Sequence, residues 1–103
     1  MSRVRQATSG DNVYTAWFTD KGTPNNNGEV MFKASNDSGK TFGAKVNLSN
    51  TPATDSLDAS IAALGKNVYV KWWEHNQTMN EPVLRVSNDS GKTFGEKIML
   101  SEK

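Results

Sequence analysis

A stretch of nine residues that occurs twice constrains this chain more than any other feature. The letters SNDSGKTFG occupy residues 35–43 and recur at 87–95, 52 positions later. Similarity continues on both sides, because GDNVYTAWF matches GKNVYVKWW upstream and AKVNLS matches EKIMLS downstream. The 103-residue chain therefore reads as one tandem duplication, with a first unit over residues 1–50 and a second over residues 51–103.

The matching blocks are not all separated by the same distance. Upstream of the nine residues the offset is 55 positions, and from the nine residues onward it is 52. Three extra residues in the first unit therefore fall between the blocks, within residues 19–28. Loops accept such insertions more readily than strands do, so we expect a loop there.

Each unit is predicted to contain four short strands joined by turns, with no helical period long enough to compete. In the second unit the expected strands are 59–64, 68–73, 83–86 and 97–100. Within 13–18 both alternating sets of side chains are largely apolar, which is typical of a strand covered on both faces. The predicted fold class is all-β, with two four-stranded antiparallel propeller blades per chain, each sandwiched between neighbours.

The repeated residues fit the turn between the third and fourth strands of a unit. Asp side chains accept backbone N–H groups within such turns, and Gly supplies left-handed backbone geometry. The Thr closes the hydrogen-bonded ring, and the Phe returns the chain to the apolar layer between blades. The residues assigned to this structural role are Ser35, Asp37, Gly39, Thr41, Phe42, Ser87, Asp89, Gly91, Thr93 and Phe94.

The pattern S-x-D-x-G-x-T-F resembles the Asp-box of the BNR repeats found in sialidases and related propellers, and it is complete in both units. The resemblance implies a peripheral folding element that lies away from any active site. A functional site repeated in each unit is the alternative interpretation, which we consider weaker because none of these residue types is reactive in that setting.

The same resemblance indicates what a sialidase would need: an arginine cluster, a tyrosine nucleophile with a glutamate partner, and an aspartate acid/base, all drawn from different blades. Two blades do not supply that set. Tyr14 and Tyr69 occupy the same strand position in both units, which favours packing over catalysis, and Lys33 is the counterpart of Arg85. We therefore expect no enzymatic activity and assign no catalytic residue.

The amino-acid composition restricts the kinds of partner and cofactor that we expect for this chain. The chain has 12 Lys and Arg against 11 Asp and Glu, with no block of one sign, so neither nucleic acid nor a membrane is an expected partner. It has no cysteine and one histidine, His75, so we expect no metal site and no cofactor. Without an apolar run near residue 1, the sequence as written predicts a soluble, cytoplasmic chain.

Propellers close with 4–8 blades, so a two-blade chain leaves two blade faces uncovered. We expect it to associate with itself, three copies being preferred because the similar sialidase family has six blades, and four being the runner-up. The predicted function is a self-assembling building block, either engineered or excised from a longer repeat protein. A carbohydrate-binding, lectin-like assembly is the alternative, although Trp72 and Trp73 point to opposite faces of a strand and at least one belongs to the core.

First strands line the centre of a propeller, so residues of 59–64 and their counterparts would lie near its axis. At the 55-residue offset Arg5 aligns with Ser60, and Arg3 aligns with Asp58. A ring of Arg5 side chains, one per copy, would suit a phosphate, sulfate or carboxylate on the axis. Arginines that extend into channel water are the favoured interpretation, because screening makes solvated charges tolerable.

Overall fold

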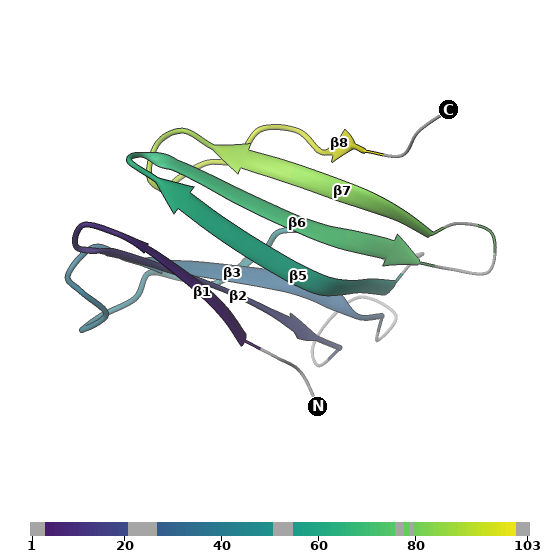
Figure 1. Ribbon diagram of the computed structural model, residues 1–103. Helices are drawn as coiled ribbons and strands as arrows, with labels where there is room; N and C mark the ends of the chain where they lie inside the picture. Colours follow the sequence, from purple (N-terminus) through teal and green to yellow (C-terminus); the bar gives the residue numbers. More distant parts are fainter. Residues whose placement is uncertain (1–3, 21–26, 51–54, 76–77, 79, 101–103) are drawn as a thin grey trace.

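The computed structural model describes residues 4–20, 27–50, 55–75, 78 and 80–100. Across these residues the chain forms two four-stranded antiparallel sheets, each with its strands in sequence order (Figure 1). The first sheet contains β1 (Val4–Ser9), β2 (Asn12–Thr19), β3 (Glu29–Ser35) and β4 (Val46–Asn47). The second contains β5 (Asp55–Leu64), β6 (Asn67–His75), β7 (Asn80–Ser87) and β8 (Ile98–Met99).

The two sheets repeat the same register, as the duplication predicts. Tyr14 pairs with Ala34 in the first sheet, and Tyr69 pairs with Val86 in the second. The tyrosines are 55 positions apart and their partners 52, so the three extra residues lie between β2 and β3, as expected. The β1–β2 and β5–β6 turns also match, with Gly10 at φ 61° and Gly65 at φ 60° as the first of two turn residues. Glycine at that position is the pattern of a type II′ hairpin.

Strand bounds depart from the predicted ones where polar residues join the ladders. The third strand of the second sheet was expected over 83–86 and extends over Asn80–Ser87, while the fourth was expected over 97–100 and is only Ile98–Met99. The predicted bounds were taken from runs of apolar residues, whereas backbone hydrogen bonding between strands also includes residues with polar side chains. In β5, Asp58 and Ala59 together lie opposite Trp72, a β-bulge with Asp58 at φ 57°.

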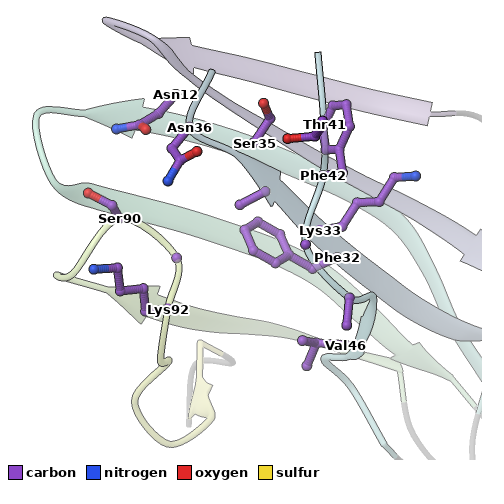
Figure 2. Close-up of a pocket in the computed structure, with 14 residues that line it drawn as sticks. Asn12, Phe32, Lys33, Ser35, Asn36, Thr41, Phe42, Val46, Ser90 and Lys92 are labelled. Atoms are coloured by element: carbon purple, nitrogen blue, oxygen red, sulfur yellow. The ribbon is translucent and has the colours of Figure 1, made fainter. Parts of the chain in front are cut away.

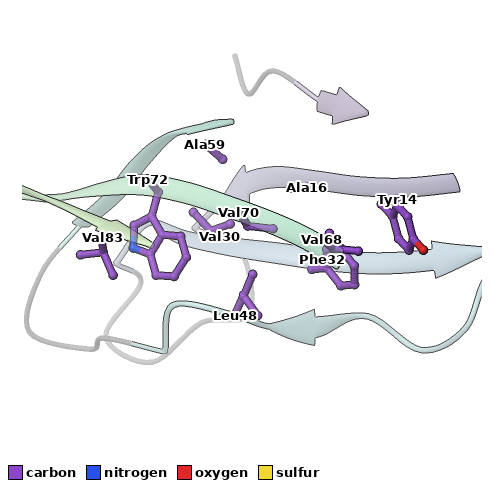
Figure 3. Packing of buried hydrophobic residues seen from close by; sticks show 10 residues of the cluster. All are labelled: Tyr14, Ala16, Val30, Phe32, Leu48, Ala59, Val68, Val70, Trp72 and Val83. Atoms are coloured by element: carbon purple, nitrogen blue, oxygen red, sulfur yellow. The ribbon is translucent and has the colours of Figure 1, made fainter. Parts of the chain in front are cut away.

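The two sheets pack face to face, and the contact forms the hydrophobic core (Figures 1 and 3). We call the packed side of each sheet its inner face and the opposite side its outer face. The buried cluster consists of Tyr14, Ala16, Val30, Phe32 and Leu48 from the first sheet and Ala59, Val68, Val70, Trp72 and Val83 from the second. Trp72 is fully buried and Trp73 half-buried, so the pair does divide between the two faces of β6.

The expectation that residues 13–18 are covered on both faces is wrong within this chain. Tyr14 and Ala16 lie on the inner face of the first sheet and are fully buried, whereas Val13 and Trp17 lie on its outer face and are only half-buried. The cause is the sheet count: the second sheet covers one face of the first. The sequence pattern therefore describes a strand with two covered faces, whereas within this chain the outer face of β2 is buried only at Thr15.

Hydrogen bonds also join the sheets at the end of the molecule remote from the repeated turns. The Gly28 amide donates to the Asp55 Oδ1 at 2.8 Å, and the Ser56 amide donates to the Gly28 carbonyl at 2.8 Å. A side chain at residue 28 would collide with the Phe18 ring, whose Cε1 would lie 2.0 Å from a Cβ there. Glycine thus leaves room for the Phe18 ring of β2 beside the segment that bonds to the start of β5.

Candidate functional site

The first repeated turn, residues 35–43, is organised around the Asp37 carboxylate. One oxygen accepts the Thr41 amide at 2.9 Å and the Ser35 hydroxyl at 2.7 Å, and the other accepts the Thr41 hydroxyl at 2.5 Å. The Ser35 hydroxyl oxygen in turn accepts the Gly39 amide at 2.9 Å. These bonds satisfy the turn from within, so the carboxylate acts as a structural acceptor.

The second turn, residues 87–95, repeats these contacts almost without change. Asp89 accepts the Thr93 amide at 2.9 Å and the Thr93 hydroxyl at 2.5 Å, and Ser87 donates to it at 2.7 Å. Hydrogen bonds from the threonine hydroxyl, the threonine amide and the serine hydroxyl lower the pKa of Asp37 to about 2, and the same set lowers the pKa of Asp89 to about 2. Hydrogen-bond donors that contact the ionised carboxylate stabilise it and therefore lower its pKa.

Each turn contains two consecutive left-handed residues, of which the sequence indicated one. Gly39 has φ 89° and Gly91 has φ 82°, as their residue type suggests, but Ser38 at 64° and Ser90 at 62° are also left-handed. The amide of each serine donates to the neighbouring hairpin, Ser38 to the Asp11 carbonyl at 2.8 Å and Ser90 to the Lys66 carbonyl at 2.9 Å. Serine carries no signal for this geometry, because glycine, asparagine and aspartate are the usual left-handed residues.

The two turns differ in what lies beside them. A Cβ at Gly91 would meet the Phe32 ring at 3.0 Å and Tyr14 Cε1 at 3.4 Å, so the second turn rests on the inner face of the first sheet. A Cβ at Gly39 would meet nothing closer than Val13 Cγ2, at 3.9 Å. The second turn is therefore packed between sheets, and the first turn lies at an open face.

The phenylalanines of the turns show the same contrast. Phe94 packs edge-on against Phe32 of the first sheet, with ring centroids 4.9 Å apart. Phe42, expected to return to an apolar layer in the same way, is 37% exposed. That expectation is wrong for the first turn, because no sheet among the described residues covers the Phe42 ring.

Arg85 and Lys33 occupy equivalent positions on β7 and β3 and have different surroundings. Arg85 donates to the carbonyls of Gly95 at 2.7 Å, Phe94 at 3.2 Å and, across the sheets, Leu48 at 2.9 Å. Burial lowers the pKa of its guanidinium. Lys33 instead places its Nζ 5.0 Å from the Phe42 ring centroid on the outer face. Arg85 thus holds the two sheets together where Lys33 has no second sheet to reach.

Two inner-face residues of the first sheet, Tyr14 and Leu48, are buried, whereas their counterparts on the outer face of the second sheet are exposed. Tyr14 has no exposed surface, whereas Tyr69 is 37% exposed. Leu48 is 1% exposed and its counterpart Leu100 is 41% exposed. The same residue types therefore stand covered in one sheet and uncovered in the other. Among the described residues the Tyr14 hydroxyl finds no hydrogen-bond partner, which could not be anticipated from the sequence.

Arg5, the residue considered for an axial anion site, is exposed on β1 and pairs with Ala16. Ser60 pairs with Lys71, the counterpart of Ala16, so Arg5 and Ser60 are equivalent in the sheets, as the alignment indicates. Asp58 is exposed at the bulge of β5, and Arg3 lies outside the described residues.

Two buried glutamates, Glu29 and Glu74, were not singled out from the sequence. Glu29 accepts a hydrogen bond from the Ser49 hydroxyl. Glu74 accepts the Ser56 hydroxyl at 2.9 Å and the Trp72 indole N–H at 2.6 Å. Glu29 begins β3 and lies next to Ser49, which follows β4, and Glu74 lies near the end of β6 next to Ser56 of β5, proximities that only the fold creates. Their hydrogen bonds to core-facing residues assign them to packing.

A cleft of about 570 Å³ lies between the two repeated turns (Figure 2). Polar side chains from both turns and from β3 line it, among them Lys33, Asn36, Thr41, Ser90 and Lys92. Among the described residues no group of three or more His, Cys, Asp or Glu side chains is placed to hold a metal ion. The same part of the chain has no helix long and apolar enough to cross a membrane.

No model of a protein family matches the sequence, and no curated protein matches it. Among solved structures, the chain is similar to a sialidase from Trypanosoma rangeli, determined in complex with sialic acid. The two share 19% sequence identity with a TM-score of 0.72, and the match covers 97% of this chain and 20% of the sialidase chain. This chain thus spans about a fifth of the length of that protein. A likeness at this identity establishes the fold: an all-β unit of two antiparallel sheets that matches part of a sialidase propeller.

Proposed function

We propose that this chain is a non-catalytic two-blade unit that associates with copies of itself to complete a closed propeller. Three copies are the preferred number and four the runner-up. The observation that carries the proposal is the contrast between Tyr14, fully buried where the second blade covers it, and Tyr69, 37% exposed at the equivalent position. The outer face of the second blade is uncovered at Tyr69, whereas the second blade covers the equivalent face of the first blade at Tyr14. A blade of another copy is therefore suited to cover the outer face of the second blade.

The exposed side chains of the outer faces support association. Leu64, Tyr69 and Leu100 are exposed in the second blade, and Val4 and Phe42 in the first. Thr15 and Met31, also on the outer face of the first blade, are already buried, so the uncovered part of that face is smaller. When a partner covers apolar surface of this kind, the associated state is stabilised by about 25 cal/mol for each Å² removed from water.

The chemistry of the repeated turns supports a non-catalytic role. The Asp37 and Asp89 carboxylates are engaged by donors of their own turns, and the lowered pKa values keep them ionised above about pH 2. A carboxylate held in that state is a poor general acid. Incubation with a fluorogenic sialoside tests this part of the proposal: we expect no turnover above the rate without protein, and saturable turnover would contradict it.

Light scattering across the micromolar range tests the association itself. We expect a mass that is a multiple of the 11.3 kDa of one chain. The Tyr69→Asp variant should shift that mass toward the single chain, because it places a charge on the uncovered face. Lys66→Ala is the matched control, since residue 66 is exposed in the β5–β6 turn and its counterpart Asp11 stays exposed beside the covered face. A folded wild-type chain that remains monomeric would contradict the proposal.

A further inference from the structure

We propose that the first Asp-box turn of one copy docks on the outer face of the second blade of the next copy, with Phe42 against Leu84 and Gly39 over Tyr69. The inference rests on the proposed self-association and goes beyond it, because it names which surfaces meet. It assigns to one of the two identical turns an intermolecular role that the other performs within the chain.

The contact between the two blades of one chain is the template. Within the chain, the second Asp-box turn lies on the inner face of the first blade: Phe94 packs edge-on against Phe32 at 4.9 Å, and Gly91 lies close to Phe32 and Tyr14. Arg85 completes the contact through its 2.9 Å hydrogen bond to the Leu48 carbonyl. One turn, one aromatic ring and one cation thus cover a defined patch of a neighbouring blade.

The receiving patch recurs, uncovered, on the outer face of the second blade. Leu84 pairs with Ile98 as Phe32 pairs with Val46, so Leu84 is the counterpart of Phe32. The remaining counterparts are Tyr69 for Tyr14 and Leu100 for Leu48, the Leu100 amide bonding to the Pro82 carbonyl as the Leu48 amide bonds to the Val30 carbonyl. The patch therefore has the same register as the covered one, and Tyr69 and Leu100 within it are exposed.

The inserting side also recurs, on the outer face of the first blade. The turn containing Gly39 has the hydrogen bonds of the turn containing Gly91, and Gly39 has open space where Gly91 has a neighbour. Lys33 lies 5.0 Å from the Phe42 ring centroid, as the Arg85 guanidinium lies 5.9 Å from that of Phe94. The first turn already has the conformation that the second adopts when packed.

The inserting turn and the receiving patch lie on opposite outer faces of the molecule, so the occupant is a second copy placed head to tail. A two-fold axis would bring identical patches together, whereas here two different surfaces are complementary. Each copy then has one inserting turn and one receiving patch free for further copies. This arrangement continues the packing between the two blades of a single chain.

Cross-linking of single-cysteine variants tests the pairing, because the chain contains no cysteine. Phe42→Cys and Leu84→Cys chains are mixed and treated with a short bismaleimide. We expect a covalent dimer joined between positions 42 and 84 to dominate, with little product from either variant alone. Lys66→Cys mixed with Leu84→Cys is the control and should give little product. The Phe32→Cys/Phe94→Cys chain should be linked internally, which calibrates the reagent.

Charged variants give a second measurement that does not depend on the reagent. Phe42→Asp removes the inserting turn and Leu84→Asp removes the receiving patch, so each variant alone should be monomeric. Their equimolar mixture retains one intact pair of surfaces and should give a species of twice the mass of one chain. Circular dichroism of each variant checks that it folds.

The outcomes separate this inference from the proposed function. Dominant 42–42 or 84–84 products from an associating chain, or a mixture of the charged variants that stays monomeric, would overturn the head-to-tail pairing and leave self-association intact. A wild-type chain that remains monomeric would overturn both.

Discussion

Asp37 and Asp89 show how much of this fold depends on single side chains. Each carboxylate accepts an amide and a hydroxyl from one threonine, four residues later, and a hydroxyl from the serine two residues earlier. Those spacings are legible in the sequence, so the roles of Asp, Thr and Gly in the turn could be predicted. The left-handed Ser38 and Ser90 could not, because their geometry follows from amides that bond to a neighbouring hairpin.

Removal of either carboxylate should destabilise the chain without changing its secondary structure. In Asp37→Ala and Asp89→Ala the threonine amide and hydroxyl lose their acceptor, and unpaired polar groups lower the free energy of unfolding. Chemical denaturation monitored by tryptophan fluorescence measures the loss. Asn36→Ala, an exposed residue of the same first turn, is the control and should leave the midpoint unchanged. Equal midpoints for Asp37→Ala and Asn36→Ala would contradict the structural role.

The lowered pKa values predict a stability that falls in acid. Folding lowers the pKa of each turn aspartate from 3.8 to about 2, so between these values the unfolded chain binds more protons than the folded one. The contribution of these carboxylates is therefore complete above about pH 4 and is lost as the pH falls toward 2 and below. Thermal unfolding from pH 6 to pH 2 measures it, and the Asp37→Asn/Asp89→Asn chain should show a shallower decline. Parallel declines for both proteins would argue against the assigned cause.

At the scale of strands and turns, the offsets between the two units predicted the structure more accurately than the pattern of apolar residues did. The offsets of 55 and 52 positions placed the extra residues between β2 and β3, and the sheet registers agree. The bounds of β5, β7 and β8 were less accurate: β5 begins at Asp55, four residues before its predicted start, Asn80 and Glu81 pair within the β6–β7 ladder, and β8 is held through two residues only. The bulge at Asp58 could not be predicted, since its left-handed backbone is set by pairing with β6.

The two repeated turns should respond differently to the same substitution. Gly39→Ala and Gly91→Ala both place a side chain on a left-handed residue, at a cost of about 1–2 kcal/mol each. Only Gly91→Ala also places a methyl group 3.0 Å from the Phe32 ring, a contact tighter than ordinary packing that the ring must shift to accommodate. Denaturant titration of the dissociated chain at high dilution should therefore rank Gly91→Ala as the less stable variant.

Association should change that ranking, because Gly39 then meets the receiving patch of another copy. In the associated state Gly39→Ala is expected to weaken the contact between copies, measured as a higher dissociation constant than that of the wild type. If Gly39→Ala and Gly91→Ala are equally destabilising at high dilution, the proposed difference between a packed turn and an open turn is incorrect.

At the scale of the whole molecule, duplication and strand pattern were sufficient to predict two blades, and the structural likeness to part of a sialidase propeller agrees with that fold. The number of copies does not follow from either, because it depends on the angle between blades of different chains. The sequence of β2 nevertheless contains the central clue: apolar side chains on both faces, of which this chain buries one. Tyr69 and Phe42, exposed where their counterparts are packed, carry the same information.

Native mass spectrometry tests the central claim most directly, because it counts copies and separates a closed ring from an open chain of subunits. A closed propeller predicts one dominant species with a mass three times the 11.3 kDa of one chain, and four times if the runner-up is correct. Head-to-tail association without closure would instead give a ladder of masses that lengthens with concentration. A single species at the mass of one chain, or such a ladder, would contradict the closed ring.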